Sequence, residues 1–120
     1  MAKFLIIDDS KLTRTMLKNI LAEEGHEIVA EAENGLEGAE LYSLHKPDIV
    51  TLDNLMPVEG GMACLKNILQ IDPGAKIIIV TSVAKESLII EELKLGAKHF
   101  IKKPFEKEDV ISAVRAVLKN

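Results

Sequence analysis

Short runs of apolar residues alternate with longer segments of mixed character along the whole chain. Uninterrupted apolar runs are typical of strands that are buried on both faces of a parallel sheet. They predict strands at Lys3–Ile7, Glu27–Ala32, Asp48–Leu52, Lys76–Val80 and Lys98–Ile101. In the intervening segments apolar residues recur with a period of about 3.6, which is typical of amphipathic helices. The final segment has the cleanest stripe, at Val110, Val114 and Val117.

The order of these segments predicts the class of fold. Alternation of strands and helices with short connections implies right-handed crossovers and a parallel sheet that is covered by helices on both faces. Five such units in 120 residues fit a flavodoxin-like (βα)5 domain of the α/β class, with the strand order 2-1-3-4-5. A barrel of the same units needs about eight of them. One domain over residues 1–120 is therefore expected, without a separate output domain.

Residues between the expected elements support this division of the chain. Gly25 and Gly96 follow helical segments, where a left-handed residue commonly ends a helix. Ser10 and Asn34 lie near helix starts, where a side-chain oxygen can accept a bond from an otherwise free backbone N–H group.

Acidic residues follow two of the expected strands at the point where each apolar run stops. Asp8 and Asp9 come after the first run, and Asp53 comes after the third. Ligand sites of open α/β sheets lie outside the carboxyl ends of the strands, so the three carboxylates are expected to share one crevice. Three like charges at short range repel one another unless a counterion is present. A bound divalent cation, expected to be Mg²⁺, would supply the counterion and find the oxygen ligands that it prefers.

Two further polar residues are expected at the same edge of the sheet. Thr81 follows the fourth apolar run, and Lys103 follows the fifth and precedes Pro104. A lysine in this position can act as a compact positive charge that faces the acids.

Composition and charge argue against several other functions. The net charge of −4 disfavours nucleic acid as a general partner. No stretch approaches about 18 consecutive apolar residues, so membrane insertion is not expected. Cys64 is the single cysteine and cannot form an internal disulfide, which fits a reducing cytosol and a cytoplasmic location. A monomer is the expected state.

Five short motifs carry a resemblance to a known family. They are Ile6-Ile7-Asp8-Asp9-Ser10, Pro47-Asp48-Ile49-Val50, Leu52-Asp53 with Met56-Pro57 and Gly61, Val80-Thr81, and Lys103-Pro104-Phe105. Each motif is weak alone, but all five occur in order and at the family's spacing. Over essentially its whole length the chain resembles the receiver domain of two-component response regulators.

The resemblance implies a phosphorylation site at the edge of the sheet. Asp53 is expected to be the phosphoacceptor, a carboxylate nucleophile that takes a phosphoryl group from a histidine kinase. Mg²⁺ is expected to bind Asp53 and Asp9 directly and Asp8 mainly through water, and the backbone carbonyl of Leu55 is the expected third protein ligand. The apolar side chain of Leu55 is predicted to hinder attack by water and to lengthen the phosphorylated lifetime.

The resemblance also implies a route by which phosphorylation changes the surface. Thr81 and Lys103 are expected to contact phosphoryl oxygens after transfer, and the bond before Pro104 is expected to be cis. Movement of Thr81 is expected to let Phe100 turn inward and to change the face formed by the fourth helix, fifth strand and fifth helix. Since Phe100 lacks the hydroxyl of the tyrosine that is common there, this switch is predicted to work by packing.

The function that follows is that of a signalling switch rather than an enzyme. The segments Asp9–Arg14 and Asp48–Asp53 are most similar to CheY-like chemotaxis regulators, which bind the flagellar motor switch. A phosphorelay intermediate that passes its phosphate to a histidine phosphotransfer protein is the alternative, because both uses share every site residue.

Two rival classes fit the sequence less well. Phosphatases of the haloacid-dehalogenase type also use an Asp at a strand end, but they want a second Asp two residues later, where this chain has Leu55. A flavin-binding module wants a loop rich in Ser, Thr and Gly after the first strand, where this chain has Asp8 and Asp9.

Overall fold

The apolar runs of the chain form one parallel sheet of five strands in the order β2-β1-β3-β4-β5. The computed structural model describes residues 1–56, 60–82 and 86–119. The elements in chain order are β1 (Lys3–Ile7), α1 (Lys11–Glu23), β2 (Glu27–Ala32), α2 (Gly35–His45), β3 (Ile49–Asp53), α3 (Gly61–Ile71), β4 (Ile77–Thr81), α4 (Glu86–Leu95), β5 (His99–Lys102) and α5 (Lys107–Leu118). The predicted flavodoxin-like fold and its strand order are confirmed.

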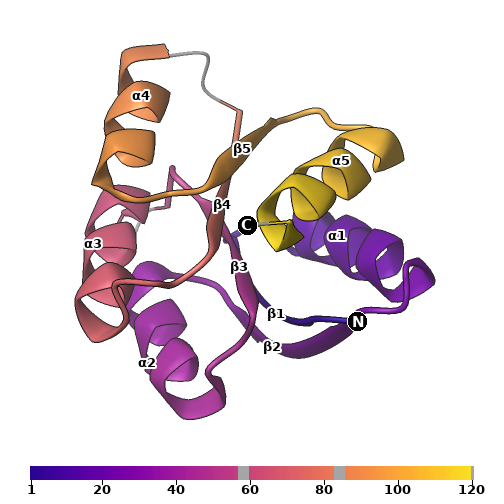
Figure 1. Ribbon diagram of the computed structural model, residues 1–120, viewed down its shortest axis with the longest axis horizontal. Coiled ribbons are helices and arrows are strands. Elements are labelled where there is room, and N and C mark those ends of the chain that lie inside the picture. Colours follow the sequence, from indigo (N-terminus) through magenta and orange to yellow (C-terminus); the bar gives the residue numbers. More distant parts are fainter. Residues whose placement is uncertain (57–59, 83–85, 120) are drawn as a thin grey trace.

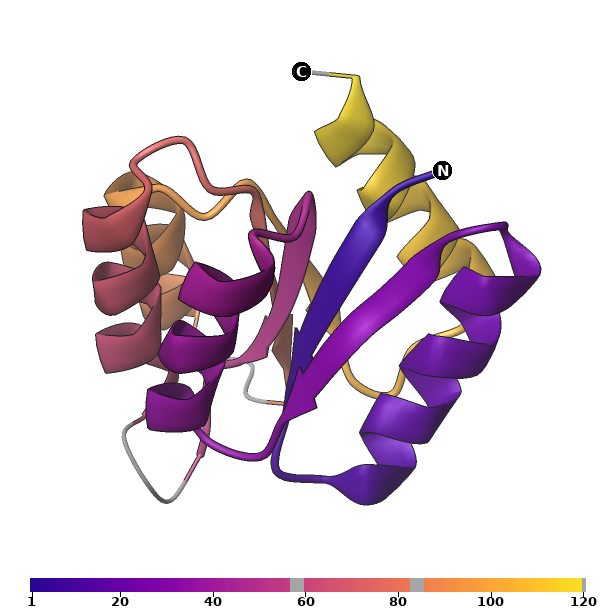
Figure 2. The same cartoon turned by 90° about the horizontal axis from the view of Figure 1, so that it is seen from below.

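Helices cover both faces of the sheet. Helices α1 and α5 lie on one side, and α2, α3 and α4 lie on the other (Figures 1 and 2). Because successive side chains of a strand point to opposite faces, β1 contributes to both cores. Phe4 and Ile6 join the apolar cluster under α1 and α5, whereas Leu5 and Ile7 join the cluster under α2 and α3.

Three strands differ from their predicted bounds by one residue. The third, fourth and fifth strands begin and end one residue later than the hydrophobic pattern predicted, at Asp53, Thr81 and Lys102. The backbone ladder continues past the apolar run, since Asp53 pairs with Val80 and Thr81 pairs with Lys102. A ladder is made of backbone groups, so a polar side chain does not end it. As a result, Asp53 and Thr81 are held by the sheet itself rather than by a loop.

The predicted helix signals are also present. The Ser10 hydroxyl accepts a hydrogen bond from the N–H of Thr13 at 3.2 Å, and Asn34 Oδ1 accepts one from the N–H of Glu37 at 2.9 Å. Gly25 and Gly96 have positive φ angles of 84° and 134°, which a side chain would strain. In the described part of the chain, no helix has the length and apolar character that crossing a bilayer requires.

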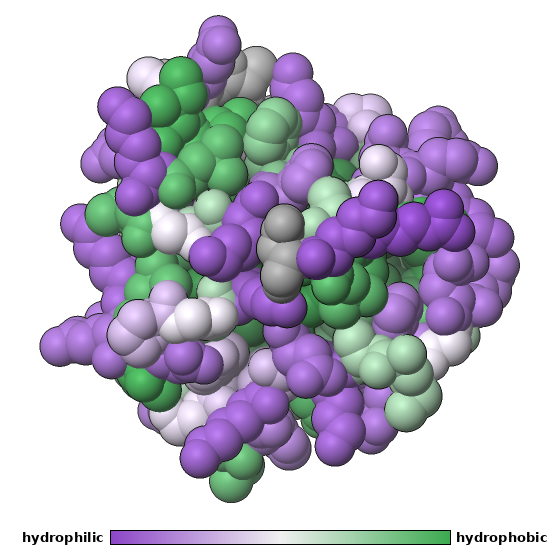
Figure 3. Space-filling model, in the orientation of Figure 1, coloured by the Kyte–Doolittle hydropathy of each residue, from purple (hydrophilic) through white to green (hydrophobic). Residues whose placement is uncertain are grey.

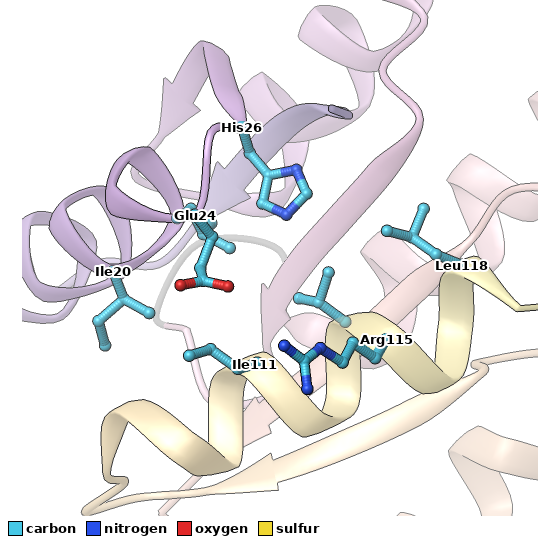
Figure 4. A pocket seen from close by; sticks show the side chains of 8 residues that line it. Ile20, Glu24, His26, Ile111, Arg115 and Leu118 are labelled. Atoms are coloured by element: carbon cyan, nitrogen blue, oxygen red, sulfur yellow. The ribbon is translucent and has the colours of Figure 1, made fainter.

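A pocket of about 210 Å³ lies between α1 and α5. Figure 4 shows its walls, with Glu24 beyond the end of α1 and Arg115 on α5. His26, which directly precedes β2, also lines it. The pocket therefore lies towards the amino ends of the strands, whereas the predicted acidic site lies at their carboxyl ends.

Candidate functional site

Three carboxylates converge at the carboxyl edge of the sheet. Asp8 and Asp9 follow β1 and Asp53 ends β3, and one oxygen of each lies within 4.8 Å of the others. Their approach follows from the sheet, because β1 and β3 are neighbours and Ile7 is in register with Leu52. Asp8 and Asp53 are buried, while Asp9 is exposed. The structure thus brings the three acids together, as the sequence predicted, and their role as metal ligands stays a prediction.

Asp8 is fixed by two different contacts. Its Oδ1 accepts a hydrogen bond from the N–H of Ser10 at 2.8 Å. Its Oδ2 is buried and has no hydrogen-bond partner among the described residues. Lys103 Nζ, 3.0 Å away, balances the charge of that oxygen.

A buried arginine holds the loop that carries Asp8. Arg14, on α1, donates from Nη1 to the backbone carbonyl of Asp8 at 2.6 Å and from Nε to Glu31 Oε1 at 3.0 Å. No role for Arg14 was predicted from the sequence. A signal was available, because Arg14 lies on the same helical stripe as the buried Leu17 and Leu21.

Asp53 is buried among groups that act on its charge in opposite directions. Its Oδ1 accepts a hydrogen bond from the N–H of Leu55 at 3.0 Å, and its Oδ2 lies 3.7 Å from Lys103 Nζ. The pKa of Asp53 is raised to about 6: burial, Asp8 and Asp9 raise it, while the Leu55 N–H and Lys103 lower it. A nearby cation would stabilise the ionised form of this carboxylate.

Leu55 lies at the rim of the site. Its side chain is 49% exposed, and its backbone N–H is already directed at Asp53. The predicted role of its carbonyl as a metal ligand stays a prediction. Pro57, which belongs to the same sequence motif as Asp53, lies outside the described residues.

Lys103 and Thr81 meet across β4 and β5. The backbone N–H of Lys103 donates to the carbonyl oxygen of Thr81 at 2.7 Å, and the Thr81 side chain is buried. The bond between Lys103 and Pro104 is cis, as the resemblance implied. The structure thus brings Lys103 and Thr81 to the edge of the sheet that holds the three acids.

Phe100 lies on β5, apart from the acids. It is in register with Ile79 of β4 and packs, half-buried, against the apolar cluster under α2 and α3. It also lines a hollow of about 430 Å³ with Ile89, Ile90 and Leu93 of α4. Figure 3 shows apolar surface over α4. The predicted switch role of Phe100 stays a prediction.

A buried polar pair that was not predicted from the sequence lies behind the site. Asn54, directly after Asp53, donates from Nδ2 to Glu92 Oε1 on α4 at 3.2 Å, and Glu92 is fully buried. Its helical spacing from the buried Ile89 was the available signal, since residues three apart share a helix face.

Gly61 packs directly on the strand end that carries Asp53. A Cβ at Gly61 would overlap Asn54 Cα and would lie 2.6 Å from the carbonyl oxygen of Asp53. These neighbours are backbone atoms, which cannot move aside as a flexible side chain can. A glycine is therefore required where α3 begins.

The donor set of this edge fits a hard divalent cation. Mg²⁺ prefers oxygen ligands and is usually held by one or two carboxylates. Asp8, Asp9 and Asp53 supply such oxygens within reach of one another, and Asp8 Oδ2 has no hydrogen-bond partner among the described residues. Lys103, 3.0 Å from Asp8 and 3.7 Å from Asp53, offers a positive charge that a phosphoryl group could also use.

Residues 4–115 match the family model of the response regulator receiver domain, and the chain belongs to this family. Receiver domains similar to it are signalling switches. The family resemblance read from the five motifs is confirmed.

Individual relatives cover nearly the whole chain. It is 44% identical over 119 residues to the chemotaxis protein CheY of Listeria monocytogenes, which covers 99% of this chain and 100% of that protein. It is 44% identical over 116 residues to CheY of Bacillus subtilis, with 97% of each covered. Among solved structures it is similar to the CheX–CheY–BeF3–Mg²⁺ complex of Borrelia burgdorferi, with a TM-score of 0.94 and 39% identity over 97% of this chain and 88% of that chain.

Proposed function

We propose that this chain is a Mg²⁺-dependent response regulator in which Asp53 is the phosphoacceptor. The observation that carries the proposal is the arrangement of charges at the edge of the sheet. Three carboxylates offer oxygens within 4.8 Å of one another, and Lys103 Nζ lies 3.7 Å from one oxygen of Asp53. Phosphoryl transfer needs positioning and neutralisation of charge rather than elaborate covalent chemistry, and this site is built to supply both.

Each residue of the site has a role in the proposed transfer. An oxygen of Asp53 attacks the phosphorus of a phosphohistidine in a histidine kinase, the P–N bond breaks, and an aspartyl phosphate forms. Lys103 places its positive charge near the incoming phosphoryl oxygens, and Thr81 donates its hydroxyl to one of them. Asp8, Asp9, Asp53 and the Leu55 carbonyl would hold Mg²⁺, which supplies charge neutralisation at the phosphoryl group.

The signal is proposed to leave the site through the face formed by α4, β5 and α5. This face carries the hollow lined by Ile89, Ile90, Leu93 and Phe100, and Ile90 is 45% exposed. Phosphorylation adds charge and acceptors at Asp53, and movement of Thr81 towards them would free space for Phe100. A change in this apolar hollow is a change in what the face can bind.

The cellular role proposed is in chemotaxis, with a flagellar motor switch protein as the downstream partner. The support comes from relatives named chemotaxis protein CheY that match the chain at 44% identity along its length. A cytoplasmic location is part of this proposal. The test measures binding of this chain, with and without beryllofluoride, to a purified motor switch protein and to a histidine phosphotransfer protein. Beryllofluoride-dependent binding to the first supports chemotaxis, and to the second a phosphorelay role.

The decisive experiment tests the phosphoacceptor directly. Incubation with acetyl phosphate should add one phosphoryl group to Asp53 when Mg²⁺ is present and none when it is chelated. Asp53→Asn should abolish the modification, whereas Asp72→Asn, which changes an acid at the opposite edge of the sheet, should leave it intact. Modification of Asp53→Asn, or none of the wild type, would refute the proposal.

A further inference from the structure

A fully buried glutamate on α4 has no part in the chemistry described so far. Glu92 is 0% exposed, and its Oε1 accepts a hydrogen bond from Asn54 Nδ2 at 3.2 Å. Its other oxygen, and Asn54 Oδ1, are buried with no hydrogen-bond partner among the described residues. A buried acid with one hydrogen bond is unusual enough to need an explanation.

Stability of the core does not explain this pair. Burial raises the pKa of Glu92, and although the bond from Asn54 lowers it, nearby Glu91 raises it again. Two apolar side chains of similar shape are often as stable as a buried polar pair, or more so. A hydrogen bond, unlike an apolar contact, fixes two particular atoms at one distance and one angle. The pair therefore contributes position rather than stability.

The two residues join the phosphorylation site to the partner-binding helix. Asn54 directly follows Asp53, and its backbone is confined because Gly61 packs against its Cα. The next residue, Leu55, donates its N–H to Asp53 Oδ1. Glu92 precedes Leu93, which lines the hollow beside Phe100.

We propose that the Asn54–Glu92 hydrogen bond couples the chain segment after Asp53 to the position of α4, and that phosphorylation reaches the α4 face through it. The Leu55 N–H donates to Asp53 Oδ1, and a phosphoryl group on Asp53 changes this acceptor. The backbone at residues 54 and 55 must therefore adjust. Because Gly61 blocks one direction, the adjustment carries the Asn54 side chain with it. Glu92 follows, and α4 shifts with respect to β5. This inference rests on the proposed function.

The test compares variants that keep and remove the hydrogen bond. Beryllofluoride with Mg²⁺ serves as the phosphoryl analogue, and the readouts are its affinity and the amide chemical-shift changes of residues 88–95. Asn54→Leu combined with Glu92→Met replaces both partners by apolar groups of similar size. We expect this variant to bind the analogue with an affinity changed about fivefold or more, since coupling between two sites is reciprocal. The amide chemical-shift changes on α4 should fall to less than half of those in the wild type.

Two matched variants keep the test sharp. Glu91→Met changes an exposed acid beside Glu92 on the same helix and should behave like the wild type. Glu92→Gln keeps the acceptor and the size of the side chain and should retain the response of α4, whereas Asn54→Ala removes the donor and should lose it. This second pair decides the matter if the double variant does not fold.

The outcomes are distinct. A wild type that binds no beryllofluoride overturns the proposed function and this coupling with it. A wild type that binds the analogue, together with bond-breaking variants that match it in affinity and in the response of α4, overturns the coupling alone.

Discussion

Lys103 Nζ lies 3.0 Å from Asp8 Oδ2 but 3.7 Å from Asp53 Oδ2. The lysine is thus closer to Asp8, which is expected to hold the metal mainly through water, than to the proposed phosphoacceptor. Its side chain is 18% exposed, while those of the two acids are nearly inaccessible. Lys103 is therefore the charge that allows two buried carboxylates to remain close together without a cation.

Removal of this charge should destabilise the metal-free protein. Lys103→Met leaves the buried Asp8 and Asp53 without this partner, and we expect a loss of roughly 1–3 kcal/mol in the free energy of unfolding in the presence of a chelator. Mg²⁺ should recover part of the loss. Urea denaturation measures both effects, and Lys102→Met, which alters an exposed neighbour, is the control. Equal losses for the two variants would contradict the prediction.

The pKa of Asp53 makes a prediction about pH. Its value of about 6 in the folded protein exceeds the ordinary value of 3.8, so between these values the folded state binds more protons than the unfolded state. The contribution of this group to stability is therefore present below about pH 4 and is lost as the pH rises through 6. Without Mg²⁺, the free energy of unfolding of Asp53→Asn should therefore rise relative to that of the wild type over this pH range, by up to about 3 kcal/mol.

The measurement is urea denaturation of both proteins at several pH values between 4 and 7, with a chelator present. The difference in unfolding free energy should grow with pH and then level off above 6. Adding Mg²⁺ should shrink it, since the cation binds the ionised form. A difference that is constant across the range would show that Asp53 titrates normally.

Gly61 should tolerate no side chain. Gly61→Ala places a Cβ against the backbone of Asp53 and Asn54, and the cost of such overpacking is roughly 1–3 kcal/mol. Displacement of the strand end should also weaken Mg²⁺ binding. Gly60→Ala is a matched control, because among the described residues the nearest atom to a Cβ there is the Met56 carbonyl oxygen at 3.9 Å. If the two variants unfold at the same urea concentration, the close approach is not real.

Leu55 is predicted to slow loss of the phosphoryl group. Its side chain is 49% exposed at the rim, and Leu55→Asn would replace an apolar cover with a group that can orient water. We expect dephosphorylation to become about 3- to 10-fold faster, which corresponds to roughly 1 kcal/mol in the barrier. Loss of label from the purified phosphoprotein measures it, with Leu44→Asn, 74% exposed on α2, as the control. A slower or unchanged rate counts against this role.

Much of the fold could be predicted because it depends on residue type and spacing. Aliphatic runs located all five strands of the sheet, and they missed the ends of three by one residue because backbone pairing continues through Asp53, Thr81 and Lys102. The meeting of the acids followed from parallel strands alone. It did not require knowledge of any single contact.

The contacts that could not be predicted depend on where separate elements happen to place two side chains. Lys103 lies closer to Asp8 than to Asp53 by less than an ångström, and a sequence pattern does not resolve a difference that small. The partnership of Asn54 with Glu92 joins residues 38 positions apart. A pattern of hydrophobicity marks Glu92 as facing inwards but cannot name its partner.

The ion pairs of Arg14 also affect the edge strand β2. One joins Arg14 to Glu31 of β2, an outermost strand of the sheet, and the other joins it to Glu33, just after that strand. Lys18 also pairs with the Glu31 carboxylate. The unpaired backbone groups of an edge strand can pair with another copy of the chain, and charged side chains on that strand disfavour such pairing. The contacts that steady the loop of Asp8 thus also keep charge along β2, and a variant that loses Arg14 should be watched for self-association as well as for lost signalling.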